Sequence, residues 1–201
     1  MTHDAAGGDP RVRLFVALDL PGGVRDELVA WRQPILQDQP GLRAVGLESL
    51  HVTLCFIGSR PAAEIEPIAG ACRSVAGLPA RSLRLAEAVW LPARRPRVLA
   101  VALEDLDGGL SRVQAGLSAL LAERCDYRPE QRPFLPHVTV ARVRRGVRIA
   151  SEQLPAPARL RFAAETVTLF RSHIGPGGAH YEPLDSVPLA GDLPGTERSE
   201  G

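Results

Sequence analysis

The chain has 201 residues, of which 45% are apolar, and a formal net charge of +1. That length suits one large domain or two small lobes that share a core, and the near-zero charge argues against a protein that coats nucleic acid through bulk charge, while leaving room for a small local basic patch. Every basic residue apart from histidine is arginine, which excludes a Schiff-base lysine, a lysyl-adenylate and a P-loop lysine.

The cysteines and the termini indicate the class of protein and its compartment. Cys55, Cys72 and Cys125 are an odd number without C-x-x-C spacing, which argues against a disulfide framework or a thiolate zinc site. The N-terminal segment has no apolar signal core, and no apolar run approaches membrane-spanning length. We therefore expect a cytoplasmic monomer without membrane contact, with loose termini over residues 1–10 and 191–201.

The first half of the chain predicts a strand, a helix, a strand, a helix and a strand. Alternating apolar residues indicate the strands, and apolar residues three or four apart indicate the helices. Pro34 is expected to kink or end the first helix, and Gly58 to end the second strand. In chain order, these elements cover residues 11–21, 24–35, 51–58, 61–77 and 82–91.

The second half repeats much of this order. It predicts a strand, a helix, a strand and a last long β segment, in that order. The strands cover residues 97–106, 137–143 and 160–170, and the helix runs from about residue 107.

Matches between the halves indicate an internal duplication. The first strands match at an offset of 85 residues, as between Leu14 and Leu99, and the two His-Val-Thr motifs are 86 residues apart. Several matches in the same order favour two related lobes, although the second lobe lacks a counterpart of the second helix. We expect a single domain over 11–190, made of lobes at about 11–95 and 96–190.

His-Val-Thr followed by an aliphatic residue occurs twice in a chain that has five histidines. Because side chains alternate along a strand, His51 and Thr53 project from the same face, roughly 7 Å apart, and His137 and Thr139 do the same. Two lobes related by a pseudo-twofold axis would bring these faces together across one cleft. The predicted site therefore holds two imidazoles and two hydroxyls around a shared point.

These groups suit phosphate chemistry. Imidazole titrates near neutrality, so one ring can accept a proton from water while the other gives one to a departing alkoxide. The threonine hydroxyls can donate to non-bridging phosphate oxygens, where charge builds during attack. No metal or cofactor is required, and a ribose 2′,3′-cyclic phosphate is the substrate that fits best. The residues alone do not distinguish the acid from the base. A lone His-x-Thr is usually structural, but two copies in equivalent positions favour function.

The motifs and the segments around them resemble a known family. The chain resembles the 2H phosphoesterases and, within them, the RNA 2′,3′-cyclic phosphodiesterases, also called 2′-5′ RNA ligases. The matching segments, spread over most of the chain, are RLFVALDLP (13–21), SLHVTLCFIG (49–58), RPFLPHVTVARV (132–143) and LFRSHIGPGGAHYEPL (169–184).

The resemblance implies an α+β fold with a bilobed, pseudo-twofold architecture, in which two mostly antiparallel sheets form a V-shaped cleft with helices on the outside. It implies metal-free hydrolysis of RNA 2′,3′-cyclic phosphate ends to 2′-phosphomonoesters, with His51 as the proton donor and His137 as the proton acceptor. It also implies reversible 2′-5′ joining of RNA ends. The expected partners are RNA or oligonucleotide ends that carry the cyclic phosphate.

Three further residues each have two interpretations. Arg142 follows the second motif, where the family often has arginine, and could bind phosphate. Strict alternation puts it on the face opposite His137, so either a bulge or strand end redirects it or its role is structural. Phe15 could stack a nucleobase or cover a lobe junction. Cys55 shares the predicted His51 face, where apolar filling is favoured over a nucleophile.

Other functions are compatible with the same residues. The chemistry could act on ADP-ribose cyclic phosphate or 2′-5′ oligonucleotides, or the chain could be an RNA- or nucleotide-binding module with vestigial catalysis, which the retained His-Thr pairs disfavour. A metal site combining His173 and His180 with the motif histidines is disfavoured, because the spacing matches no ligand pattern. Arg144, Arg145 and Arg148 form a basic turn that either touches RNA phosphates or is solvated.

Overall fold

The computed structural model of the chain describes residues 9–80, 82–175 and 178–190. The termini that we expected to be loose lie outside the described residues, apart from residues 9 and 10. The first half contains β1 (Arg11–Asp19), α1 (Gly22–Asp38), β2 (Leu42–Ala44), β3 (His51–Pro61), α2 (Ile65–Arg73) and β4 (Leu83–Leu91), with short 3-10 helices at Leu47–Ser49 and Ala62–Glu64. The second half contains β5 (Val98–Asp105), α3 (Gly109–Arg124), β6 (His137–Val143), β7 (Arg161–Phe162), β8 (Thr166–Gly175) and β9 (Gly178–Pro188).

Several predicted boundaries were wrong. β3 continues through Gly58 to Pro61, because Gly58 adopts a φ of +84° beside an irregularity in the β1–β3 register. Helix α2 consequently begins at Ile65, whereas α1 contains Pro34 and ends at Asp38. The predicted last β segment divides into β7 and β8, and the sequence did not predict β9, which forms a hairpin with β8.

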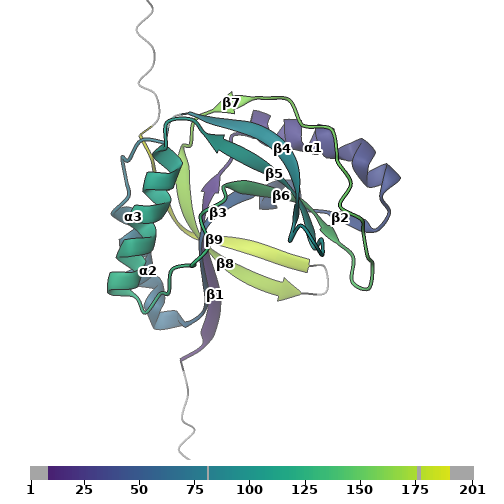
Figure 1. Cartoon of the computed structure of the whole chain (residues 1–201). Coiled ribbons are helices and arrows are strands. Elements are labelled where there is room, and N and C mark those ends of the chain that lie inside the picture. The colour runs from purple at the N-terminus through teal and green to yellow at the C-terminus, as the bar shows by residue number, and fades with distance from the viewer. Residues whose placement is uncertain (1–8, 81, 176–177, 191–201) are drawn as a thin grey trace, which may run out of the picture.

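The described strands form one nine-stranded sheet in the order β7-β4-β5-β6-β3-β1-β8-β9, with β2 paired to β6. The two mostly antiparallel sheets that we expected are therefore joined into one. Within the sheet, a single residue pair between β6 and β3, Val52 and Val138, joins the section β7-β4-β5-β6 to the section β3-β1-β8-β9. Because this junction is so short, the two sections can diverge on either side of it. Each section contains strands from both halves of the chain, since β4 pairs with β5 and β8 pairs with β1, so lobes divided at about residue 95 do not match the sections of the sheet. In Figure 1, β4, β5 and β6 arch over the β8–β9 hairpin.

The pair formed by Val52 and Val138 also relates the two halves to each other. The two residues are 86 positions apart, like the His-Val-Thr motifs, so each pairs with its own counterpart, as residues on a twofold axis do. Leu18 lies opposite Val52, and Val101 lies opposite Val138. On this basis we propose that the lobes are copies of one unit. Leu18 and Val101 are 83 positions apart, whereas the sequence predicted an offset of 85 for the first strands, so that prediction was wrong by two residues. Because side chains alternate along a strand, a shift of two residues leaves each side chain on the face that was predicted.

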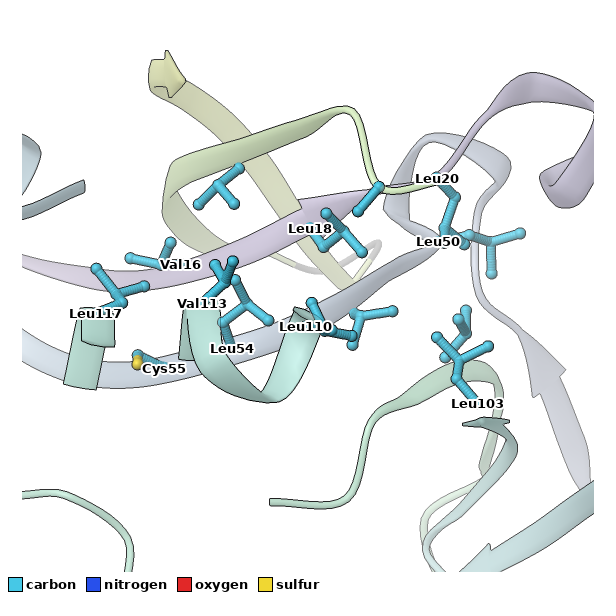
Figure 2. Packing of buried hydrophobic residues seen from close by; sticks show 14 of the residues in the cluster. Val16, Leu18, Leu20, Leu50, Leu54, Cys55, Leu103, Leu110, Val113 and Leu117 are labelled. Atoms are coloured by element: carbon cyan, nitrogen blue, oxygen red, sulfur yellow. The ribbon is translucent and has the colours of Figure 1, made fainter. Parts of the chain in front are cut away.

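The long helices pack against strands of the opposite half of the chain. α3, from the second half, packs against β3, and Figure 2 shows its Leu110 and Val113 near Leu18 and Leu54 of the first half. α1, from the first half, contacts β6 of the second. Full burial of each such side chain stabilises the fold by roughly 1.5–3 kcal/mol. The helices therefore cover the sheet face that carries the core and leave the opposite face available for a site.

Candidate active site

His51 and His137 begin β3 and β6, and both face away from the buried valine that follows each of them. On this face lies a cavity of about 490 Å³, which we call the central cavity. The structure brings all four motif residues to it, since His51, Thr53, His137 and Thr139 line its wall. Other residues that line it include Phe15, Arg142, Arg13, Arg43, Phe56 and Tyr181.

The antiparallel pairing of β3 with β6 determines how the two motifs meet. Because Val52 pairs with Val138, the same register places His51 opposite Thr139 and Thr53 opposite His137. The two histidines are then diagonal neighbours, with Cα atoms roughly 7–8 Å apart. A phosphate group fits between two imidazoles at this separation, with one hydroxyl beside each ring.

A backbone carbonyl two residues earlier orients each imidazole. His137 Nδ1 lies 2.8 Å from the carbonyl oxygen of Leu135, and His51 is hydrogen-bonded to the backbone of Ser49. A carbonyl oxygen only accepts, so a ring N–H must be the donor in each bond. The other ring nitrogen is then an acceptor when the imidazole is neutral and a second donor when it is protonated.

Burial lowers the pKa of His51 from 6.5 to about 4; the bond to Ser49 raises it, and the charges of Arg142 and His137 lower it further. Aromatic rings supply much of this burial, with centroids 5.0 Å away for Phe15 and 5.4 Å away for Tyr181. His51 is therefore neutral near pH 7 in the free protein. A bound phosphate would offset the charge of Arg142 and favour the protonated ring.

A bulge after the second motif breaks the alternation of side chains. Between Thr139 and Ala141, β6 has one residue more than the facing segment of β5. Val140 and Ala141 are therefore both buried, and Arg142 turns onto the face of His137, where it lines the central cavity. Of the two alternatives for Arg142, the structure shows the bulge that redirects it from the face that strict alternation gives.

β3 has the matching bulge after the first motif. It has one residue more than β1 between Thr53 and Cys55, so Leu54 and Cys55 are both buried. The expectation that Cys55 shares the face of His51 was therefore wrong. Its thiol lies in the core, where burial raises its pKa to about 11. Phe56 takes the next position on the cavity face and is 49% exposed.

Side chains of helices α1 and α3 form hydrogen bonds to both bulges. Arg32 of α1 donates from Nη1 to the carbonyl oxygens of Val140 at 2.7 Å and Val45 at 2.6 Å. Gln114 of α3 donates from Nε2 to the carbonyl oxygen of Leu54 at 3.4 Å. Each helix thus bonds to the bulge of the opposite lobe. Arg32 is only 6% exposed, and these carbonyl bonds offset part of the cost of burying its charge.

Phe15 lies beneath His51 in a cluster of aromatic rings. It is 4% exposed, stacks on Phe170 with centroids 5.2 Å apart, and meets the edge of Tyr181 at 4.9 Å. This burial favours a role in supporting the His51 ring over stacking a nucleobase. Tyr181 was missed in the sequence because it belongs to β9, which no local pattern predicted.

Arg13 and Phe56 are further cavity residues that the sequence analysis missed. The Arg13 guanidinium lies 5.5 Å from the centroid of the Phe56 ring, within the range of a cation–π contact. A second cavity, of about 820 Å³, shares Thr53, Phe56 and His137 with the first. Its remaining wall includes Phe134 and is mostly apolar. The site therefore continues past His137 into a space that could hold a nucleoside.

His173 and His180 lie away from the central cavity, facing each other across the β8–β9 hairpin with ring centroids 6.4 Å apart. His173 Nε2 lies 2.7 Å from a carboxylate oxygen of Glu182. Among residues 9–80, 82–175 and 178–190, no group of three or more His, Cys, Asp and Glu side chains could hold a metal ion. In the same part of the chain, no helix has the length and apolarity needed to cross a membrane.

Known proteins resemble this chain over most of its length. The family model for LigT-like phosphoesterases matches residues 18–100. The RNA 2′,3′-cyclic phosphodiesterase of Escherichia coli is 31% identical over 179 residues, covering 86% of this chain and 93% of that protein. The RNA 2′,3′-cyclic phosphodiesterase of Thermus thermophilus is 32% identical over 202 residues, covering 94% and 96%.

Solved structures show the same architecture. The crystal structure of TT0787 of Thermus thermophilus matches with a TM-score of 0.78 and 31% identity, over 90% of this chain and 100% of that one. The crystal structure of E. coli LigT complexed with 3′-AMP matches with a TM-score of 0.74 and 26% identity, over 90% and 99%. The predicted α+β class, rich in antiparallel strands, is confirmed.

Proposed function

Because the chain belongs to the LigT-like phosphoesterase family, we propose that it hydrolyses RNA 2′,3′-cyclic phosphate ends to 2′-phosphomonoesters. The observation that carries this proposal is the meeting of two His-x-Thr pairs in one cavity, with each imidazole held by the backbone two residues earlier. This arrangement supports a reaction in which an acid, a base and two hydroxyl donors act on a single phosphorus.

In the proposed reaction, His137 accepts a proton from the attacking water. Its Nδ1–H is engaged by the carbonyl of Leu135, so the other nitrogen of the neutral ring is free to act as the base. The water oxygen forms a bond to phosphorus as its proton passes to His137. Attack in line with the 3′ oxygen breaks the bond between phosphorus and that oxygen, which leaves the phosphate on the 2′ oxygen.

His51 gives its proton to the departing 3′ oxygen. Its pKa of about 4 in the free protein is compatible with this role, because the negative charge of the bound phosphate raises the pKa before the bond breaks. The family resemblance assigns the donor role to His51, since the register of the two motifs and the carbonyl bond of each ring are alike and do not distinguish the roles. Proton exchange with solvent restores both rings after each turnover.

Thr53, Thr139 and Arg142 bind the phosphate in this proposal. The two hydroxyls donate to non-bridging oxygens, whose negative charge grows as water attacks. The Arg142 guanidinium pairs with the same oxygens and is well matched to them in geometry and charge. Its position on the cavity face, set by the bulge in β6, supports this role.

The proposed reaction needs no metal ion and no cofactor, since side chains supply the acid, the base and the anion-binding groups. A ribose 5′-hydroxyl in place of water would give 2′-5′ joining of RNA ends by the same proton transfers. The proposal also takes the enzyme to be cytoplasmic, and the buried free thiols of Cys55, Cys72 and Cys125 support a reducing compartment.

The test is hydrolysis of a synthetic oligonucleotide that ends in a 2′,3′-cyclic phosphate, in buffer containing EDTA. We expect a single product, the 2′-phosphomonoester, identified by comparison with synthetic 2′- and 3′-phosphate standards. A 3′-phosphate product would contradict the proposed bond cleavage. Activity that is lost in EDTA and restored by a divalent cation would contradict metal-free catalysis.

Single substitutions of the two histidines are the matched controls for this experiment. His51→Ala and His137→Ala should each lower kcat by about 10²–10⁴-fold, the usual contribution of one general acid or base. Near-UV circular dichroism should show that both variants keep the native fold. Near-normal turnover by either variant would remove the paired-histidine mechanism.

A further inference from the structure

A second polar groove lies beside the central cavity, and the proposed chemistry does not use it. Its volume is about 390 Å³, and two loops form its walls. The loop between β4 and β5 supplies Arg94, Arg95 and Arg97, and the loop after β6 supplies Val147 and Arg148. We call it the arginine groove. Within the basic turn noted in the sequence, only Arg148 lines it.

No acidic side chain of the described residues balances the positive charge of the arginine groove by lining it or pairing with its arginines. Across the described residues, its four arginines form no side-chain hydrogen bond or ion pair, and no acidic residue lines the groove. Some other arginines of the chain pair with carboxylates; Arg84 and Arg159, for example, both pair with Glu104. An uncompensated cluster of like charges repels itself and attracts an anion.

Backbone hydrogen bonds fix both walls of the arginine groove. The Arg97 amide donates to the carbonyl of Leu91 at 2.9 Å, and the Val147 amide donates to the carbonyl of Arg144 at 3.1 Å. Gly146 adopts a φ of +81°, which allows the tight turn on the second wall. Because the loops are ordered in advance, a ligand loses less free energy in arranging them.

Backbone pairing of β5 with β6 connects the arginine groove to the wall of the central cavity. Arg142, which lines the central cavity, pairs across the sheet with Val98 of β5 and Arg43 of β2. Arg97 directly precedes Val98, and its carbonyl accepts a hydrogen bond from the amide of Val143 at 2.8 Å. Positively charged residues therefore extend from the cavity that holds both histidines into the groove.

We propose that the arginine groove binds backbone phosphates of the RNA strand that leads up to the cyclic end. This inference rests on the proposed function, because only an RNA substrate continues as a polyanion beyond the reacting phosphate. A strand whose last phosphate lies between His51 and His137 leaves the central cavity past Arg142, and its preceding phosphates meet arginines on both walls. Guanidinium–phosphate contacts carry no base information, so the groove favours an oligonucleotide over a mononucleotide without reading its sequence.

The test compares the R94S/R148S variant with the wild type on two substrates. One is a 2′,3′-cyclic mononucleotide, which is too short to reach the groove, and the other is a single-stranded RNA oligonucleotide with the same cyclic end. For the oligonucleotide we expect kcat/KM to fall about tenfold per arginine, the worth of one charge-assisted hydrogen bond. The slope of log kcat/KM against log salt should flatten by about 0.7 per lost contact. For the mononucleotide, kcat/KM should not change.

R112S/R161S is the matched control variant. It removes the same charge from exposed positions on α3 and β7 that line neither cavity nor the groove, and it should leave both substrates unaffected. The inference is overturned if R94S/R148S loses nothing on the oligonucleotide, loses equally on both substrates, or behaves like the control.

A different result would separate this inference from the proposed function. If the wild type hydrolyses neither substrate, the proposed function fails. The arginine groove is then tested by measuring the binding of the same oligonucleotide with fluorescence anisotropy. An RNA site is supported if R94S/R148S binds the oligonucleotide more weakly than the wild type and if polyglutamate does not displace the oligonucleotide from the wild type. Equal binding by both proteins, or displacement by polyglutamate, overturns it.

Discussion

Phe56 and Arg142 occupy equivalent positions in the two lobes. Each lies five residues after the histidine of its motif, and a bulge turns each onto the wall of the central cavity. One lobe thus presents an aromatic ring where the other presents a guanidinium. An aromatic ring suits a nucleobase, and a guanidinium suits a phosphate. The lobes carry the same pair of reactive groups but different binding groups.

Substitution of these two residues should separate binding from catalysis. Phe56→Leu removes the aromatic ring but keeps the side chain apolar. KM for a cyclic nucleotide should therefore rise by the factor that corresponds to a loss of about 1–3 kcal/mol of stacking free energy, and kcat should change little. Arg142→Gln removes a cation that faces growing charge, so kcat should fall about 10²–10³-fold, as when one oxyanion donor is lost. Steady-state kinetics measure both values, and the opposite pattern would contradict the assignment.

An activated leaving group distinguishes the acid from the base. On a nucleoside p-nitrophenyl phosphodiester, His51→Ala should recover most of its lost rate, because nitrophenolate departs without a proton. His137→Ala should stay impaired, because water still has to be deprotonated. The measurement is the ratio of kcat/KM on the activated and cyclic substrates for each variant. Recovery by His137→Ala instead would exchange the two roles.

The low pKa of His51 makes the stability of the fold depend on pH within a defined window. Above pH 6.5 the ring is neutral in both states, but between 6.5 and about 4 only the unfolded ring takes up a proton. The free energy of unfolding therefore falls as the pH falls, by about 3 kcal/mol at most from this group. Urea unfolding across the window should show a smaller loss for His51→Asn. Equal losses in the two proteins would assign the dependence to other groups.

Arg32 should affect turnover although it lies behind the sheet. Arg32→Met leaves the carbonyls of Val45 and Val140 without their guanidinium donor, which should cost about 1–3 kcal/mol of stability. Releasing the bulge should also lower kcat, because Arg142 is no longer held on the cavity face. The R32M/R142Q double variant should then be no slower than R142Q alone. Fully additive losses would show that Arg32 acts independently of Arg142.

Gln114→Leu is the counterpart of that change in the other lobe. Gln114 bonds to the bulge that positions Phe56, so its loss should raise KM in the manner of Phe56→Leu and spare kcat. A fall in kcat without a change in KM would show that the two bulges do not act separately. Thermal unfolding of both helix variants supplies the comparison of stability.

The fixed period of a strand explains why the sequence predicted the shared face of each His-Thr pair. Over the three residues from His51 to Thr53, alternation leaves little room for error. A bulge before Arg142 was one of two alternatives, but the bulge after the first motif was not predicted, because Leu54 and Cys55 are both apolar and either could belong to the core. Two consecutive apolar residues after each His-x-Thr were the available signal, and they recur at Val140 and Ala141.

Longer-range pairing accounts for the remaining differences between the predicted and observed folds. β9 contains charged residues and two prolines, and it is a strand because it pairs with β8 along its length. Nothing in its own pattern could have placed Tyr181 beside His51. The continuity of the sheet rests on Val52 and Val138, and a contact between distant residues leaves no local trace in either segment.

The pairing of Val52 with its own counterpart shows what joining the halves in one polypeptide makes possible. A homodimer of one lobe, built on the same axis, would have an isologous interface and would also hold two histidines over one cavity. In that homodimer, each position would have the same residue in both subunits, so a phenylalanine on one side of the cavity could not lie opposite an arginine at the equivalent position on the other side. Covalent fusion lifts this restriction: the walls can diverge in chemistry while the imidazoles stay where symmetry places them.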